Sequence, residues 1–111
     1  MLNCKGGEKM LKINFEFSRG ILFVRLKGDL NKYNIKDLKI KDFKFIVLNI
    51  DNMYSIDSYS IKYLNNIYKN NQSKNGKMIV CDKFNISKKL LKDIPKINKE
   101  YDAYELFERM I

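Results

Sequence analysis

The chain contains no histidine and no tryptophan, and it has only one proline and two cysteines, Cys4 and Cys81. Two cysteines cannot build a disulfide framework, and without histidine there is neither a Cys/His zinc cluster nor a histidine base. No apolar run approaches the roughly 18 residues of a membrane-spanning helix, and the N-terminus lacks the apolar stretch of a signal peptide. These absences exclude most familiar hydrolase chemistry and predict a cytosolic protein that is not an enzyme and holds no metal or cofactor.

The apolar content of the chain is sufficient for one folded domain. Its 111 residues are 45% hydrophobic and 32% charged, which is typical of a globular domain of ordinary size. The first ten residues, Met1–Met10, show no periodicity, and Lys5–Met10 is what translation of a purine-rich ribosome-binding site and its spacer would give. We therefore expect a leader over residues 1–10, with Met10 as the true initiator, and one domain over residues 11–111.

The net charge of +9 raises nucleic acid or an anionic surface as a partner. However, the basic residues are 19 lysines and only 3 arginines, accompanied by 13 asparagines and 14 isoleucines, which is the composition expected from an AT-rich genome. Lysine also lacks the bidentate fork that arginine offers to phosphate and base edges. We therefore expect no direct DNA binding. The run Lys36, Lys39, Lys41 and Lys44 is interpreted as a solvated face, with an acidic partner or lipid headgroups as the alternative.

Hydrophobic periodicity predicts an α/β fold. Alternating or continuous apolar residues indicate strands at Leu11–Phe17, Ile21–Lys27, Phe45–Ile50, Met78–Cys81 and Ile97–Tyr101. The first two strands are joined by a short glycine turn and predict a hairpin. The nearly continuous apolar run of the third predicts the centre of the sheet.

Helical spacing of apolar residues predicts about four helices, at Asp29–Leu38, Ser58–Asn71, Ser87–Ile94 and Ala103–Met110. Pro95 is expected to end the third of them. A hairpin followed by strands that alternate with helices predicts a sandwich of helices on a mixed sheet of about five strands.

Residues that could carry chemistry are scarce. Gly20, Gly28 and Gly76 are isolated, so there is no glycine-rich phosphate loop. Asp51 and Asp57 are the only carboxylates expected to converge near the end of the central strand, and no base or nucleophile accompanies them. Catalysis by this pair is therefore not expected.

The segment Ser55–Ile61 (SIDSYSI) is the most informative, because it joins the predicted central strand to a helix. Asp57 or Ser58 is a preferred N-cap, since its side-chain oxygen can accept from the unpaired N–H groups of the first helical turn. The same position lies at the positive end of the helix dipole, where a phosphate on Ser58 would be stabilised. The residues alone leave both readings open.

Three segments carry a resemblance to a known family. Ile46–Ile50 followed by Ile56-Asp57-Ser58 is similar to a buried strand and an Asp-Ser-Ser/Thr-Gly motif, Lys27–Asn31 to a Gly-Glu-Leu/Ile-Asp turn, and Gly76–Cys81 to the next turn and strand. These are features of the STAS domain, and the chain most resembles the small bacterial anti-sigma factor antagonists. It differs from the motif at Tyr59 and Ser60.

The resemblance implies a STAS-like fold and a partner-switching role. It implies that an anti-sigma factor with serine kinase activity binds the chain and phosphorylates Ser58, and that the added charge breaks the interface. The partner-binding residues that it implies are Asp29, Leu30, Asn31, Tyr33, Asp57, Ser58 and Tyr59. The alternatives are an accessory subunit of a membrane transporter on the same fold and, from another class, a small basic nucleic-acid binder.

Overall fold

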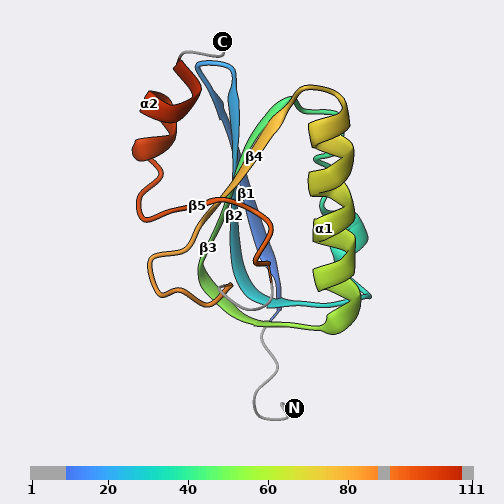
Figure 1. Cartoon of the computed structure of the whole chain (residues 1–111). Coiled ribbons are helices and arrows are strands. Elements are labelled where there is room, and N and C mark those ends of the chain that lie inside the picture. The colour runs from blue at the N-terminus through green and yellow to red at the C-terminus, as the bar shows by residue number, and fades with distance from the viewer. Residues whose placement is uncertain (1–9, 88–90, 109–111) are drawn as a thin grey trace.

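The computed structural model describes residues 10–87 and 91–108, and its centre is a five-stranded sheet (Figure 1). The strands are β1 (Lys12–Ser18), β2 (Ile21–Leu30), β3 (Phe45–Ile56), β4 (Lys77–Cys81) and β5 (Lys96–Ile97). They lie in the order β1-β2-β3-β4-β5, so β3 is central as predicted. β1 is antiparallel to β2, and the other pairs are parallel. The mixed sheet predicted from the sequence is therefore confirmed.

Two α-helices flank the sheet, α1 (Ser58–Ser73) on one face and α2 (Asp102–Glu108) on the other (Figure 1). The larger core lies on the α1 face, where Leu64 and Ile67 of the helix pack with buried residues of β2, β3 and β4. On the other face Ala103 and Phe107 of α2 pack over Phe23 and other buried strand residues. Because β2, β3 and β4 are covered on both faces, their sequences read as continuous apolar runs rather than alternating ones.

The β1–β2 hairpin closes through a two-residue turn. Ser18 pairs with Ile21, and between them Arg19 and Gly20 have φ values of 53° and 82°. Positive φ at both central positions is typical of the tight hairpin turn whose twist matches that of the strands. The predicted hairpin is confirmed.

β2 and β3 are longer than predicted, because they continue to pair beyond Lys27 and Ile50. The second strand was predicted to end at Lys27, but Gly28 pairs with Met53, and the ladder runs on to Leu30 opposite Ile56. Two register shifts interrupt this extension, so β3 carries extra residues there. The polar and apolar residues of Asp51–Ile56 do not alternate regularly, which is why the sequence pattern did not reveal a strand.

The number of helices was overestimated, since the described part of the chain has two α-helices and not about four. In place of the predicted helix Asp29–Leu38 there is only a 3-10 turn, η1 (Ile35–Asp37). The side chain of Asn31 accepts from the backbone N–H of Tyr33, and that of Asn34 accepts from the N–H of Asn31, both at 2.9 Å. Such local side-chain bonds offer the backbone an alternative to the helical ladder.

The predicted helix Ser87–Ile94 is also wrong in its described part; residues 88–90 lie outside the described residues. Leu91–Ile94 form bends and turns. The Lys96 ammonium donates to the carbonyls of Leu91 and Ile94, and Pro95 follows directly. Pro95 has no N–H to donate to the Leu91 carbonyl, and the Lys96 ammonium takes that place, so no helix continues through this segment.

The last predicted strand is confirmed only at its first residue, and the last predicted helix is confirmed. The predicted strand Ile97–Tyr101 shares only Ile97 with the two-residue β5, because turns at Lys99–Ala103 lead into α2. α2 matches the predicted helix Ala103–Met110 as far as Glu108. In the described part of the chain, no helix combines the length and apolar character required to cross a bilayer.

A network of charged and polar side chains ties the hairpin to the C-terminal part of the chain. Arg25 of β2 donates to both carboxylate oxygens of Glu100 and also pairs with Glu16 of β1 at 2.9 Å. Asn49 of β3 donates to Glu100 at 2.6 Å. The hydrogen bond from Arg25 lowers the pKa of Glu100 below its usual value. The network therefore fixes the segment that precedes α2 across three strands.

Candidate functional site

The start of α1 is organised by Asp57, the residue directly after β3. Asp57 has an extended backbone (φ −88°, ψ 169°), and its Oδ1 accepts from the backbone N–H of Ser60 at 2.8 Å. This is an N-cap, which satisfies one of the unpaired N–H groups of the first turn. The predicted cap at Asp57 or Ser58 is thus confirmed at Asp57.

The other oxygen of Asp57 holds a neighbouring loop. Asp57 Oδ2 accepts from the backbone N–H of Lys32 at 2.9 Å, and the N–H of Asp57 donates to the carbonyl of Leu30 at 3.1 Å. Burial raises the pKa of Asp57, but its contacts with Ser60 and Lys32 outweigh this effect and place the pKa below the usual 3.8. One ionised carboxylate therefore joins the helix start to the loop that follows β2.

A second contact joins the same two segments. The Ser55 hydroxyl donates to Asp29 Oδ1 at 2.8 Å, and these residues are opposite each other in the β2–β3 ladder. The Asn34 side-chain amide donates to the carbonyl of Asp29 at 2.9 Å. The end of β2 and the end of β3 thus form one cross-linked surface beside the N-terminus of α1.

Exposed side chains cover this surface. Ser58 is exposed, and Tyr33 and Tyr59 have exposed fractions of 76% and 53%. Tyr59 stacks with Tyr63 one helical turn later at a centroid distance of 6.5 Å. The Lys32 ammonium lies 5.2 Å from the centre of the Tyr33 ring. A serine hydroxyl is therefore presented to solvent at a helix N-terminus among aromatic residues.

The structure brings together six of the seven predicted partner-binding residues near this surface. The exception is the side chain of Leu30, which is 1% exposed and packs in the core of the α1 face. Its carbonyl accepts from the N–H of Asp57, so Leu30 contributes to the surface through its backbone and not through its side chain.

Sequence reasoning did not single out Lys32 or Ser55 as residues of this site. Lys32 acts through its backbone N–H, which any residue other than proline would provide. The contact of Ser55 with Asp29 depends on the unpredicted extension of β3. Knowledge of the β2–β3 register would have been the signal for Ser55.

The other candidate residues have structural roles. Asp51 Oδ1 accepts from the backbone N–H of Lys83 at 2.8 Å, whereas Asp57 accepts from the N–H groups of Ser60 and Lys32. The two carboxylates, which were expected to converge, therefore hold different segments. Cys81 is 1% exposed, as predicted for a buried apolar residue, and burial raises the pKa of its thiol to about 12. A thiol with such a pKa is unreactive at neutral pH. Cys4 lies outside the described residues.

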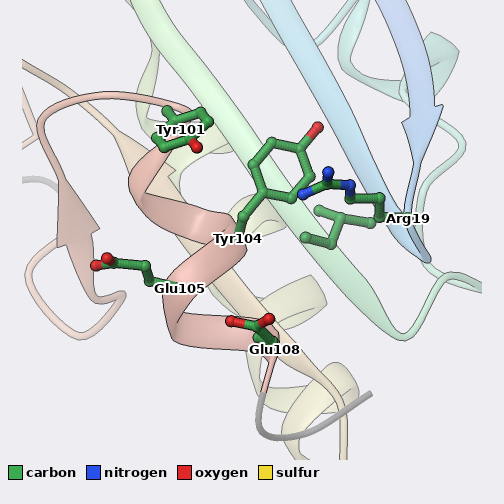
Figure 2. A pocket seen from close by; sticks show the side chains of 6 residues that line it. Arg19, Tyr101, Tyr104, Glu105 and Glu108 are labelled. Carbon is green, nitrogen blue, oxygen red and sulfur yellow. The ribbon is translucent and has the colours of Figure 1, made fainter.

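A separate hollow of about 490 Å³ lies beside α2 (Figure 2). The Arg19 guanidinium lies 4.9 Å from the centre of the Tyr104 ring, and the Tyr104 hydroxyl donates to Ser18 at 3.0 Å. Figure 2 shows these two side chains side by side, with the carboxylates of Glu105 and Glu108 on the helix nearby. The hollow contains none of the predicted site residues, and its contacts fasten the hairpin turn to α2.

Known proteins share both the sequence pattern and the fold. No family model matches the chain. The anti-sigma F factor antagonist of Paenibacillus polymyxa is 31% identical over 80 residues, which cover 65% of this chain and 68% of that protein. The chain belongs to the STAS-domain family of anti-sigma factor antagonists. The family resemblance identified from the sequence is thereby confirmed.

Solved structures agree with this membership at the level of the fold. The unphosphorylated form of the anti-sigma factor antagonist SpoIIAA has a TM-score of 0.73 and 16% identity, covering 90% of this chain and all of that one. The phosphorylated form of SpoIIAA from Bacillus has a TM-score of 0.61 and 15% identity, covering 92% and 100%. The five-stranded STAS sheet is therefore shared by chains with little sequence in common.

Proposed function

We propose that this STAS-domain protein is an anti-sigma factor antagonist whose partner is an anti-sigma factor with serine kinase activity. Family membership supports the antagonist role. The observation that carries the proposal is the exposed Ser58 directly after Asp57, whose carboxylate fixes both the helix start and the loop at Lys32. The catalytic step belongs to the kinase, and this chain supplies the acceptor hydroxyl.

The rigid surface around Ser58 suits a partner that recognises shape before it transfers phosphate. Tyr33 and Tyr59 are exposed aromatic residues, a type enriched at interface hot spots. The side chains of Asp57 and Asn31 hold the backbone N–H groups of Lys32 and Tyr33, and that of Asp29 accepts from the Ser55 hydroxyl. Rigid support reduces the conformational entropy lost on binding.

Phosphorylation of Ser58 would change this surface without unfolding it. The phosphate adds roughly −1.5 to −2 charges at the helix N-terminus, where the dipole favours an anion. Lys62, which is exposed and one turn further along α1, is placed to pair with it. The partner, however, would meet a new dianion beside Asp57 and Asp29, and the interface would weaken.

The decisive experiment is incubation with ATP, Mg²⁺ and the candidate kinase, followed by intact-mass measurement. We expect the mass of one phosphate on the native chain and none on Ser58→Ala. Ser73→Ala is the matched control, because Ser73 is an exposed serine at the opposite end of the same helix. Phosphate that persists on Ser58→Ala, or no phosphate on the native chain with a kinase that binds it, would contradict the switch.

Binding can be tested separately from phosphorylation. Tyr59→Ala should weaken the complex with the unphosphorylated chain by roughly 30-fold, about the 2 kcal/mol of an aromatic hot spot. Phe84→Ala is the control, since Phe84 is also well exposed at 64% but lies in the loop after β4. Calorimetric titration measures the affinity of each variant for the partner. Repeating it in low and high salt distinguishes a protein partner from nucleic acid, because nucleic-acid affinity would fall steeply with salt. Equal losses for both variants would rule out the proposed surface.

A further inference from the structure

The first strand presents an apolar surface at the edge of the sheet. In the part of the chain that the structure describes, β1 has a strand neighbour only on its β2 side. Its residues Phe15 and Phe17 are 48% and 63% exposed, and Phe17 contacts the half-exposed Phe43 at a centroid distance of 6.1 Å. Contiguous exposed apolar residues of this kind mark interaction surfaces.

The backbone of β1 is also oriented for pairing. Ser18 and Ile21 close the two-residue turn, and in such hairpins the closing pair exchanges both of its hydrogen bonds. Hydrogen-bonded pairs then recur at every second residue, at Glu16 and Asn14. The N–H and C=O groups of Ile13, Phe15 and Phe17 consequently point away from β2, toward the open edge.

β1 lacks two of the features that usually protect an edge strand, proline and a bulge. It contains no proline, and its pairing with β2 runs through seven residues without a bulge. Its polar side chains lie on the face opposite the phenylalanines, so they do not shield the apolar side. An unprotected edge of this kind is a template for another strand.

We propose that β1 pairs antiparallel with β1 of a second copy, forming a symmetric dimer with a continuous sheet. With Asn14 opposite Asn14 of the second copy, Lys12 faces Glu16 and Ile13 faces Phe15. Phe17 then faces Leu11, so every apolar residue meets an apolar one, and the outward backbone groups of Ile13 and Phe15 meet as hydrogen-bonded partners. The strand is complementary to itself in both charge and hydrophobicity.

The charges select this register among the possible ones. A shift of one residue would bring the polar face of one strand beside the apolar face of the other. A shift of two residues keeps the faces but places Lys12 opposite Ser18 and Glu16 opposite Asn14. Only the proposed register forms two Lys12–Glu16 pairs across the dimer, and opposite charges on facing strands are favourable.

The first test measures the mass of the full chain by sedimentation equilibrium from micromolar to millimolar concentration. We expect a monomer–dimer equilibrium in which Lys12→Glu weakens dimerisation by roughly tenfold, because two like-charge pairs replace two opposite ones. Glu16→Lys should weaken it as well, and the double variant K12E/E16K should restore it. Circular dichroism checks that each variant is folded, since Glu16 also contacts Arg25.

The second test is amide hydrogen exchange at low and high protein concentration. The N–H groups of Ile13 and Phe15 should become protected only at high concentration, whereas those of Asn14 and Glu16 should be protected throughout by β2. A monomer at every concentration overturns the proposal. So does protection of Ile13 and Phe15 that is independent of concentration, which would mean that the chain covers its own edge, or a dimer that Lys12→Glu leaves unchanged.

The dimer and the proposed switch stand independently. Ser58 lies at the start of α1 after β3, and β2 separates that strand from β1. We therefore expect Ser58→Ala to dimerise as the native chain does, and Lys12→Glu to remain a substrate of the kinase.

Discussion

Two aspartate–serine pairs follow neighbouring parallel strands, and the structure uses them in opposite ways. Asp57 follows β3 and accepts the N–H of Ser60, and Asp82 follows β4 and accepts the N–H groups of Ile86 and Ser87. Ser87, however, is 1% exposed, and its hydroxyl donates to Asp82 at 2.6 Å, whereas Ser58 is exposed beside Asp57. The hydroxyl of Ser87 is committed to holding a loop, while that of Ser58 faces solvent.

The difference shows that a neighbouring carboxylate does not by itself decide whether a serine hydroxyl is exposed. Asp82 is 4% exposed and accepts three hydrogen bonds, from the N–H groups of Ile86 and Ser87 and from the Ser87 hydroxyl. Asp57 uses its two oxygens for backbone groups on two different segments. A kinase requires a hydroxyl outside such a network, and of these two serines only Ser58 is outside one.

The largest effect is expected from Asp82→Ala. Removing this carboxylate leaves the buried Ser87 hydroxyl and two N–H groups without their acceptor, so the free energy of unfolding should fall by about 3 kcal/mol. Urea unfolding measures it. Ser87→Ala is the milder control, since it removes one bond and leaves Asp82 with its two backbone donors. A loss below about 1 kcal/mol for Asp82→Ala would mean that the loop does not depend on this carboxylate.

Asp57→Ala should have a smaller effect on stability, about 1 kcal/mol, which is typical of a lost N-cap. Its larger consequence should be at the loop after β2, where amide exchange at Lys32 should accelerate because the acceptor is gone. Asp57→Ser keeps the cap at Ser60 with a side chain too short to hold both segments. If Lys32 remained equally protected in Asp57→Ala, the link between helix and loop would be refuted.

Acidification should protonate both aspartates and lower the free energy of unfolding. This is the smallest of the three expected changes in stability. Burial raises the pKa of Asp82, but the hydroxyl and N–H groups of Ser87 and the N–H of Ile86 lower it more, and the pKa of Asp57 is lowered likewise. A carboxyl with a lowered pKa stabilises the fold above its unfolded-state value of 3.8, and this stability is lost as the pH falls through the folded pKa.

Urea midpoints between pH 7 and pH 2.5 measure this loss. The midpoint should change less with pH in Asp82→Asn and in Asp57→Asn than in the native chain. Some pH dependence should remain in both variants, because the hydrogen bond from Arg25 also lowers the pKa of Glu100. Protonation keeps the aspartate side chain in place, so the free energy of unfolding should fall by less than it does in Asp82→Ala. A midpoint that is independent of pH in this window would contradict the assignment.

The sequence could predict those elements whose apolar pattern reflects burial. The apolar run of β3 and the helical spacing of Leu64 and Ile67 are consequences of the core on the α1 face, and they located the centre of the sheet and α1. The failures lie where polar side chains decide the backbone. Asn31 and Asn34 replace a helix by a turn, and the Lys96 ammonium, rather than a backbone N–H, donates to the carbonyls of Leu91 and Ile94.

The candidate site could be predicted only in part for a related reason. Asp57 and Ser58 were found because capping chemistry depends on residue type. The contribution of Lys32 is a backbone N–H, and that of Ser55 depends on a strand extension without regular alternation. Leu30 was placed on the partner surface by the family resemblance, whereas its side chain is buried at the end of β2.

The two register shifts between β2 and β3 have a consequence for insertions and deletions. Between the pairs Arg25–Asn49 and Leu30–Ile56, β2 advances by five residues and β3 by seven. This difference in length sets where Ser55 meets Asp29 and where Asp57 meets Lys32. Deleting a single residue from 51–54 would shift one end of the ladder out of register by one residue. The positions least tolerant of length change thus lie inside a strand, whereas loops usually absorb such changes.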